Sequence, residues 1–390
     1  MIKNFSVSNY NSIKEKQTIS FEILPKDMLD DSSFQTKCRN NLNSIIAIIG
    51  NNSAGKSNIL KALADCLIIA QNSYTLFSAN DPIFIFLPFI TEKHKNTTFE
   101  IIFETNNKEY KYKLEMNSGN ICYEYLGMHN KRAFSTIYEI TREKDKVNFL
   151  VWKFEKKLND IDRKRFEERT NSTLFSFLLN TGHLAGIGVK EITNYDYNFK
   201  SIPVEIQEDR LNKISQIMKN FDLGFAGFSF TAIQQPRKEN PLESETKKIL
   251  LLNHKTKKGN FSLPFDLESD GTQKIVYLLN KLLAIIEAGG IAICDEIESS
   301  IHPYLIKNII NNLFANKEIN KNNAQLIFST HLPWLLEDRT KTQIYLVEKN
   351  EGLSTELYRL DEVEGVRNDD NFCNKYLAGA YGAVANLRWF

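Results

Sequence analysis

Apolar residues along the chain follow repeats that predict alternating strands and helices. Residues 45–49 are continuously apolar, as in a strand buried on both faces, and the run ends on Gly50. From Lys56, apolar residues recur at helical spacing and predict a helix. The alternation returns after Phe265, with helices expected at 271–288 and 302–314 and strands at 291–294, 325–329 and 343–347. Parallel strands joined by helices form a doubly covered sheet, so the pattern predicts an α/β fold.

Other parts of the chain follow different patterns. Alternation with period two in the first forty residues and across 98–154 predicts antiparallel strands, the latter as a meander. Residues 153–170 mix both charges densely and favour a solvated helix. A helix is expected at 204–221, and the polar, Lys-rich stretch 236–260 is typical of a loop or hairpin.

Composition limits the class of protein. With 390 residues, 42% of them hydrophobic and 25% charged, the chain can bury a sizeable core. A net charge of +1 excludes a uniformly basic surface but leaves a local basic groove open. Five widely spaced cysteines suggest neither a disulfide framework nor a zinc ribbon. The apolar stretch 83–90 is too short for a membrane helix, so we expect a soluble, cytoplasmic protein without membrane contact.

The sharpest motif is a glycine-containing loop between the strand ending at Gly50 and the helix from Lys56. Its pattern, GxxxxGK[ST], lets successive backbone N–H groups point at phosphate oxygens at a helix N-terminus. We expect Lys56 to reach the β- and γ-phosphates and Ser57 to offer its hydroxyl to Mg²⁺. The alternative is an ordinary glycine-containing turn. The candidate nucleotide-binding residues are Gly50, Asn51, Asn52, Ser53, Ala54, Gly55, Lys56, Ser57 and Asn58.

Two acids follow the apolar strand 291–294. At the carboxyl edge of an α/β sheet, Asp295 would hold Mg²⁺ and Glu296 would act as general base on the attacking water. His331 follows strand 325–329 and is a candidate sensor of the γ-phosphate. Alone, each of these motifs is weak, since strands often end in acids and a histidine at a strand end is often structural.

A further motif opens the helix expected at 271–288. Ser269 and Gly271 stand at its start, where they would bind a γ-phosphate together with the helix N-terminus. A purely structural helix cap explains the same residues, and both interpretations remain open.

Along the chain the four motifs follow the order phosphate loop, Ser269 and Gly271, acid pair and His331, and in this order they resemble ATP-binding-cassette (ABC) ATPase heads of the SMC/RecF/OLD type. More narrowly, the stretches 50–60, 295–303 and 376–383 resemble small ABC-type ATPases of bacterial defence islands, similar in style to the AriA subunit of PARIS and the PtuA subunit of Septu. The resemblance implies an α/β phosphate-loop NTPase head, a mixed or parallel sheet with helices on both faces plus an antiparallel β-subdomain, carrying an α/β insertion. The implied division is 1–115 (first half of the head), 116–259 (insertion), 260–350 (second half) and 351–390 (a tail packing on the head).

The resemblance also implies a mechanism. Two ATP molecules with Mg²⁺ are bound between two heads, each held by the phosphate loop of one copy and Ser269 and Gly271 of the other. The chain would therefore form a homodimer or a higher homo-oligomer. OLD-type proteins carry a Toprim nuclease after the ATPase, but only 59 residues follow His331 here, so we expect any effector to be a separate protein.

Three functional classes follow. The first is an ATPase sensor or scaffold that controls a separate effector, for which a Toprim nuclease is a candidate. The second is a DNA-repair-like ATPase that clamps DNA through its head dimer, with phosphate contacts from Lys247, Lys248, Lys255, Lys257 and Lys258. The third is a nucleotide-dependent assembly module that does not hydrolyse ATP.

Overall fold

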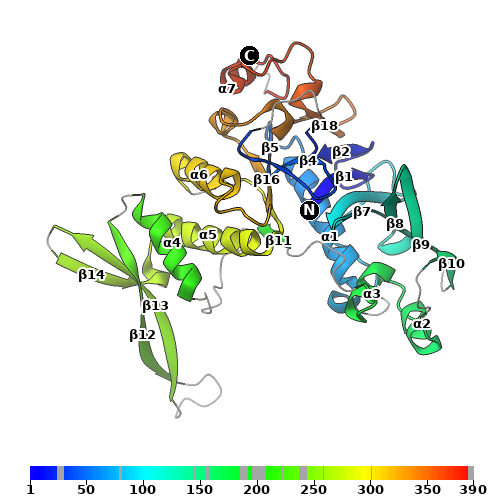
Figure 1. Cartoon of the computed structure of the whole chain (residues 1–390), viewed down its shortest axis with the longest axis horizontal. Helices are drawn as coiled ribbons and strands as arrows, with labels where there is room; N and C mark the ends of the chain where they lie inside the picture. The colour runs from blue at the N-terminus through cyan, green and yellow to red at the C-terminus, as the bar shows by residue number, and fades with distance from the viewer. Residues whose placement is uncertain are drawn as a thin grey trace. The chain divides into compact units, whose positions relative to one another are not determined.

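The computed structural model describes residues 1–23, 30–78, 81–143, 146–153, 158–184, 192–195, 208–221, 224–236, 244–257, 259–299 and 301–384. The chain divides into two compact units (Figure 1). Unit 1 comprises Met1–Tyr195, Ile286–Ile297 and Asn311–Phe390. Unit 2 comprises Asp196–Ile285 and Glu298–Ile310. Each unit is described by itself below.

A six-stranded sheet forms the centre of unit 1. Its order is β11 (Ile192–Tyr195), β15 (Ile291–Cys294), β16 (Gln325–Thr330), β5 (Ile45–Gly50), β17 (Ile344–Lys349) and β18 (Thr355–Arg359). The first five strands are parallel, and β18 runs antiparallel to β17. Every residue of β5, β15 and β16 is buried, as expected for strands covered on both faces.

The second sheet of unit 1 is antiparallel. Its seven strands follow the order β10 (Lys146–Trp152), β9 (Ala133–Glu143), β8 (Asn120–Asn130), β7 (Lys108–Asn117), β6 (Thr97–Thr105), β1 (Ile2–Ser8) and β2 (Gln17–Ser20). The helix α1 (Lys56–Leu76) contacts strands of both sheets, and one hydrophobic core includes side chains from all three elements. The predicted α/β class, with a parallel sheet and an antiparallel β-subdomain, is confirmed.

The expected boundary at 115/116 differs from the observed division. It falls inside β7, and cross-strand pairing continues without interruption from β6 through β10. A cut there would expose paired strand edges, so the sheet holds residues up to 152 in unit 1. The remaining elements of unit 1 are β3 (Ser33–Gln35), β4 (Asn41–Asn43), α2 (Asp160–Glu167), α3 (Leu174–Asn180), η2 (Asn311–Ala315), η3 (Pro333–Leu336), η4 (Lys341–Gln343), η5 (Leu360–Glu362) and α7 (Phe372–Leu377).

Unit 2 contains helices and a three-stranded antiparallel sheet. The sheet order is β12 (Phe225–Pro236), β13 (Ser244–Thr256) and β14 (Gly259–Pro264), and α4 (Glu208–Lys219) packs on β12. β13 lies within the stretch 236–260, and its antiparallel pairing with β14 agrees with the hairpin that was one of the two expectations for this stretch. The short helix η1 (Phe265–Leu267), most of α5 (Asp270–Ala288) and α6 (Pro303–Ile310) complete the unit.

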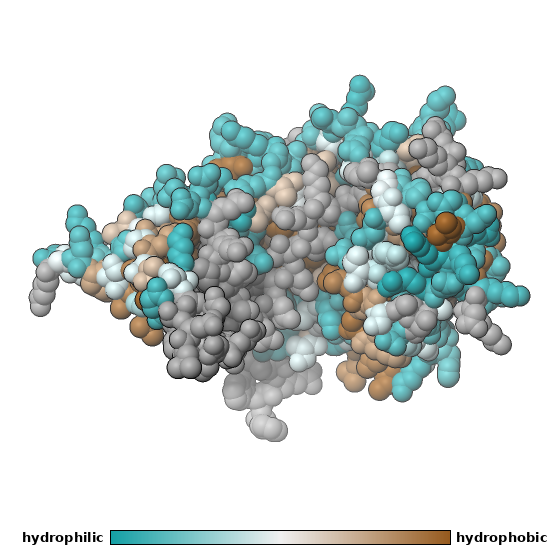
Figure 2. Space-filling model, turned by 90° about the horizontal axis from the view of Figure 1, so that it is seen from below, coloured by the Kyte–Doolittle hydropathy of each residue, from teal (hydrophilic) through white to brown (hydrophobic). Residues whose placement is uncertain are grey.

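On the face seen in Figure 2, the coloured residues are mainly hydrophilic, with apolar patches between them. In unit 1, several large apolar side chains are more than 60% exposed, among them Phe84, Leu87, Ile90 and Leu353. Among the described residues, no helix is long and apolar enough to cross a membrane.

Candidate functional site

Three motifs of the sequence lie at one edge of the parallel sheet of unit 1. Strand β16 lies between β15 and β5, with Cys294 opposite Phe328 and Thr330 opposite Ile49. The phosphate loop, His331 and the acid pair therefore each follow the carboxyl end of one of three neighbouring strands. This edge is where open α/β sheets bind their ligands.

The backbone of the phosphate loop needs its glycines. A Cβ on Gly50 would lie 2.1 Å from the carbonyl oxygen of Val347 on the neighbouring strand β17. Gly55 has φ +114°, and a Cβ there would lie 2.1 Å from Thr355 Oγ1. Within the loop, Asn52 and Ser53 are exposed, as is Ser57 in the first turn of α1. Their exposure leaves this edge open to a ligand.

Lys56 is held inside the loop that it follows. Its ammonium donates to the carbonyl oxygens of Gly50 at 2.8 Å and Asn51 at 3.0 Å. The residue is only 5% exposed, so its ammonium group stays beside the loop and the side chain does not extend into solvent. An incoming phosphate would compete with these carbonyl oxygens for the ammonium.

Ser329 joins the two acids, and no motif in the sequence had indicated this role for it. Its hydroxyl donates to Asp295 Oδ1 and accepts from the backbone N–H of Glu296 at 2.7 Å. The backbone carbonyl of Ser329 accepts from the N–H of Ile297 at 3.2 Å. Glu296 has φ +44°, a conformation that is uncommon for glutamate. The fully buried Ser329 thus fixes the turn that carries both acids.

The proposed base and the proposed sensor are neighbours. Glu296 Oε1 lies 3.5 Å from His331 Nε2, and their side chains are 51% and 36% exposed. A water molecule and a phosphate can therefore reach both groups. The carboxylate is in a position to accept a proton, and the imidazole can donate to an anion beside it.

The oxygen donors at this edge fit Mg²⁺. Asp295 uses Oδ1 for the bond with Ser329, while Ser57 presents an exposed hydroxyl. Among the described residues, no three His, Cys, Asp or Glu side chains gather as a metal site. Mg²⁺ usually takes only one or two protein oxygens and completes its shell with phosphate oxygens and water, which agrees with this sparse donor set.

Ser269 and Gly271 belong to unit 2, whereas the residues described above belong to unit 1. Ser269 Oγ accepts from the N–H of Thr272 at 3.2 Å and lies 2.8 Å from Thr272 Oγ1, so it caps α5. The preceding residue, Glu268, contacts His254 Nε2 at 2.6 Å through Oε1. Ser269 itself is exposed, so the cap is also accessible to a ligand.

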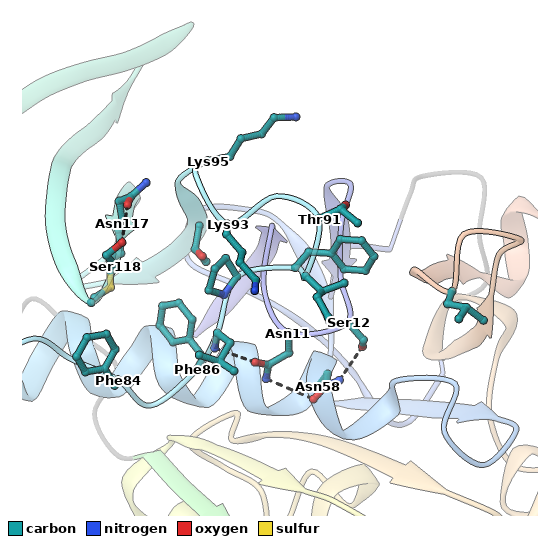
Figure 3. Close-up of a pocket in the computed structure, with 18 of the residues that line it drawn as sticks. Asn11, Ser12, Asn58, Phe84, Phe86, Thr91, Lys93, Lys95, Asn117 and Ser118 are labelled. Atoms are coloured by element: carbon teal, nitrogen blue, oxygen red, sulfur yellow. Dashed lines mark hydrogen bonds between the residues drawn. The ribbon is translucent and has the colours of Figure 1, made fainter.

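A large cavity lies beside the first turn of α1. It has a volume of about 880 Å³, and Figure 3 shows Phe84, Phe86, Lys93 and Asn58 around it. Asn58, a candidate nucleotide-binding residue, lines the cavity, and both ends of its amide are hydrogen-bonded. Its Nδ2 donates to Ser12 Oγ at 2.6 Å, and its Oδ1 accepts from Asn11 Nδ2 at 3.4 Å.

The candidate DNA-contacting lysines lie along β13 and the turn after it. Lys248, Lys255 and Lys257 are exposed, and the Lys248 ammonium lies 4.0 Å from the centre of the Phe230 ring. The side chain of Lys247 and all of Lys258 lie outside the described residues.

Solved structures with similar folds include three SMC heads. The first is titled "Crystal structure of the SmcHead bound to the C-winged helix domain of ScpA" (14% identity, 94% of this chain and 99% of that chain, TM-score 0.46). The second is the "SMC head domain from Thermotoga maritima" (16%, 92% and 98%, TM-score 0.41). The third is an Smc head with an extended coiled coil, bound to the C-terminal domain of ScpA, from Pyrococcus furiosus (14%, 93% and 97%, TM-score 0.43). A search among curated proteins found no match to the chain.

The comparison with protein families gives a match over most of the chain. Residues 45–337 match a family described as "AAA domain, putative AbiEii toxin, Type IV TA system". The matched range begins with β5 and includes the phosphate loop, the acid pair and His331. The chain therefore belongs to this AAA-domain family of phosphate-loop ATPases.

Proposed function

We propose that the protein binds ATP with Mg²⁺ at the edge formed by β15, β16 and β5 and hydrolyses it to ADP and phosphate. The observation that carries the proposal is the placement of the phosphate loop, the acid pair and His331 at the ends of three adjacent parallel strands. Neighbouring strands lie about 4.8 Å apart, so these groups fall within the span of one triphosphate.

Each residue then has a defined task. Lys56 exchanges its two carbonyl partners for the β- and γ-phosphate oxygens, and the N–H groups of the loop bind the same phosphates. Glu296 takes a proton from the attacking water as the new P–O bond forms, and the bond to ADP breaks. His331 donates to the γ-phosphate. Ser57 and Asp295 would hold Mg²⁺, which neutralises phosphate charge when it is bound.

We assign the nucleoside to the cavity beside Asn58. The cavity lies next to the first turn of α1, and its walls include the aromatic rings of Phe84 and Phe86 (Figure 3). Aromatic and aliphatic walls with a few polar groups are typical of small-molecule sites. The exposed Leu87, Ile90 and Leu353 would lose contact with water when a base occupies the cavity.

At the level of the assembly, we propose an ABC-type homodimer that controls a separate effector in antiviral defence, with a Toprim nuclease as the candidate effector. The exposed cap formed by Ser269 supports the dimer, because it offers a helix N-terminus to the γ-phosphate held by a second copy. The family description, which names a toxin of a toxin–antitoxin system, supports the role in defence.

The substitution Lys56→Ala tests the nucleotide site. We expect it to weaken MgATP binding by at least about 100-fold in calorimetry, because a charge-assisted contact to phosphate is lost. Lys61→Ala is the matched control, since Lys61 is an exposed lysine on the same helix. Unchanged ATP affinity in Lys56→Ala would contradict the assignment of the phosphate loop.

The alternative function is a DNA clamp. The exposed Lys248, Lys255 and Lys257 favour it as a local basic patch. DNA binding that falls steeply with salt and weakens when Lys255 and Lys257 are changed to Ala would support the clamp over the effector model.

A further inference from the structure

A chain of hydrogen bonds begins at the cavity. The N–H of Leu87, on the cavity wall, donates to Asn11 Oδ1 at 3.0 Å. Asn11 Nδ2 then donates to Asn58 Oδ1, and Asn58 Nδ2 donates to Ser12 Oγ, as the dashed lines in Figure 3 show. Each amide thus accepts on one side and donates on the other. We call this chain, continued below to Ala54, the hydrogen-bond relay.

The relay continues through Thr355 to the phosphate loop. Ser12 Oγ lies 2.8 Å from Thr355 Oγ1, and Thr355 Oγ1 donates to the carbonyl oxygen of Ala54 at 2.9 Å. A carbonyl can only accept, so the single hydroxyl proton of Thr355 is directed at Ala54. Ser12 must then donate to Thr355, and the relay has one direction from the cavity to the loop.

The hydroxyl of Thr355 has all of its hydrogen-bonding capacity occupied. Besides donating to Ala54, it accepts from Ser12 and from the ammonium of Lys349 at 3.0 Å. Thr355 is 0% exposed, so no water can replace a lost partner without rearrangement. The same oxygen lies against Gly55, where an added Cβ would come within 2.1 Å of it. Thr355 therefore supports two consecutive residues of the phosphate loop.

We infer that Thr355 is a positioning residue for the phosphate loop, and that the relay links the loop to the cavity wall. Thr355 lies at the start of β18 and is separated from Ala54 by 301 residues in sequence. Its effect on ATP binding rests on the function proposed above, whereas its effect on the loop backbone does not. Ser12 acts in the same way by donating to Thr355, and Asn58 does so by contacting Ser12 and Asn11.

The test compares Thr355→Val with Thr355→Ser. Valine keeps the shape of threonine but removes the hydroxyl, and serine keeps the hydroxyl. Thr342→Val is the matched control, because Thr342 is also buried and accepts a hydrogen bond, from Asn43 Nδ2. It lies just before β17, near the opposite edge of the sheet from the phosphate loop.

The first measurement uses the nucleotide-free full chain. Amide hydrogen exchange over residues 51–57 should be about five- to tenfold faster in Thr355→Val, near the wild-type rate in Thr355→Ser and unchanged in Thr342→Val, since one net hydrogen bond is worth about 1 kcal/mol. Equal exchange in folded Thr355→Val and wild type, or an equal increase in Thr342→Val, would overturn the inference.

The second measurement is MgATP affinity by calorimetry. We expect Thr355→Val to raise the dissociation constant about five- to tenfold, and Thr355→Ser to restore it to within about twofold of wild type. Wild-type affinity in Thr355→Val would overturn the link to binding. If the folded wild-type chain does not bind ATP, the proposed function fails, while hydrogen exchange still decides the role of Thr355.

Discussion

Ser329 holds the two acids of the site in a single arrangement. Its hydroxyl contacts the carboxylate of Asp295 and the backbone N–H of Glu296, so one side chain sets both the proposed metal ligand and the proposed base. A side chain that orients such groups typically affects activity by 10- to 100-fold.

We predict that Ser329→Ala lowers kcat of ATP hydrolysis by about 10- to 100-fold with little change in ATP affinity, because phosphate binding depends on the loop instead. Steady-state kinetics together with calorimetry separates the two effects. Ser44→Ala is the control, since Ser44 is also buried and hydrogen-bonded and lies just before β5, at the end opposite the phosphate loop. A loss of affinity equal to the loss of kcat would argue against this role.

Asp65 is a buried acid on α1 that accepts a hydrogen bond from the Tyr10 hydroxyl at 2.7 Å. Burial raises its pKa to about 6 from an ordinary value of 3.8, although the bond with Tyr10 acts in the opposite direction. The folded state therefore holds the proton more tightly than the unfolded state. The contribution of Asp65 to the free energy of unfolding therefore falls as the pH rises from about 4 to 6, and it stays constant above that range.

We predict that Asp65→Asn removes this dependence, because the amide can accept from Tyr10 without carrying a charge. Relative to wild type, the variant should gain about 2–3 kcal/mol of unfolding free energy at pH 7 compared with pH 4. Urea unfolding at several pH values measures the difference, with the exposed Asp31→Asn as control. A constant difference between Asp65→Asn and wild type across pH 4–7 would contradict the prediction.

Among the elements, the turn between β5 and α1 depends on contact with β18. Gly55 combines a positive φ of +114° with close packing against Thr355. Gly182 also has a positive φ, +79°, but an added Cβ there would meet nothing within 4 Å. A comparison of substitutions at the two glycines therefore distinguishes the effect of backbone strain from that of the steric contact.

We predict that Gly55→Ala strongly weakens ATP binding and lowers stability by more than the roughly 1 kcal/mol expected for a positive φ alone. Gly182→Ala should cost only about that amount and bind ATP normally. Thermal unfolding and calorimetry on both variants check this expectation. If the two variants behaved alike, the contact with Thr355 would have no role at the loop.

At the scale of the whole molecule, the proposed ATP site and the motif around Ser269 lie in different compact units. The dimer model predicts that Glu296→Gln, which binds ATP but lacks the base, accumulates as an ATP-bound dimer. Sedimentation with saturating MgATP should show the dimer for Glu296→Gln and a smaller species for the double variant that also carries Lys56→Ala. A monomer in the first case would contradict the head-dimer model.

Features that depend on local chemistry can be predicted without the fold. Gly50 to Ser57 carry a complete phosphate-loop pattern, and the apolar runs of β5, β15 and β16 predict buried parallel strands without further information. The acids and His331 were identified as well, because each directly follows such a strand. That these groups lie at the ends of neighbouring strands, however, becomes evident only from the order of strands in the sheet.

Contacts between groups far apart in the sequence, in contrast, could not be predicted without the folded structure. Ser329 at the end of β16 contacts Asp295, which follows the neighbouring strand β15. Thr355 donates to Ala54, from which it is separated by 301 residues in sequence. The continuation of β7 into β10, which moved the expected boundary at 115/116, is likewise a matter of strand pairing. Hydrogen bonds between such segments depend on register and burial, and the periodicity of one segment contains no information about its partner.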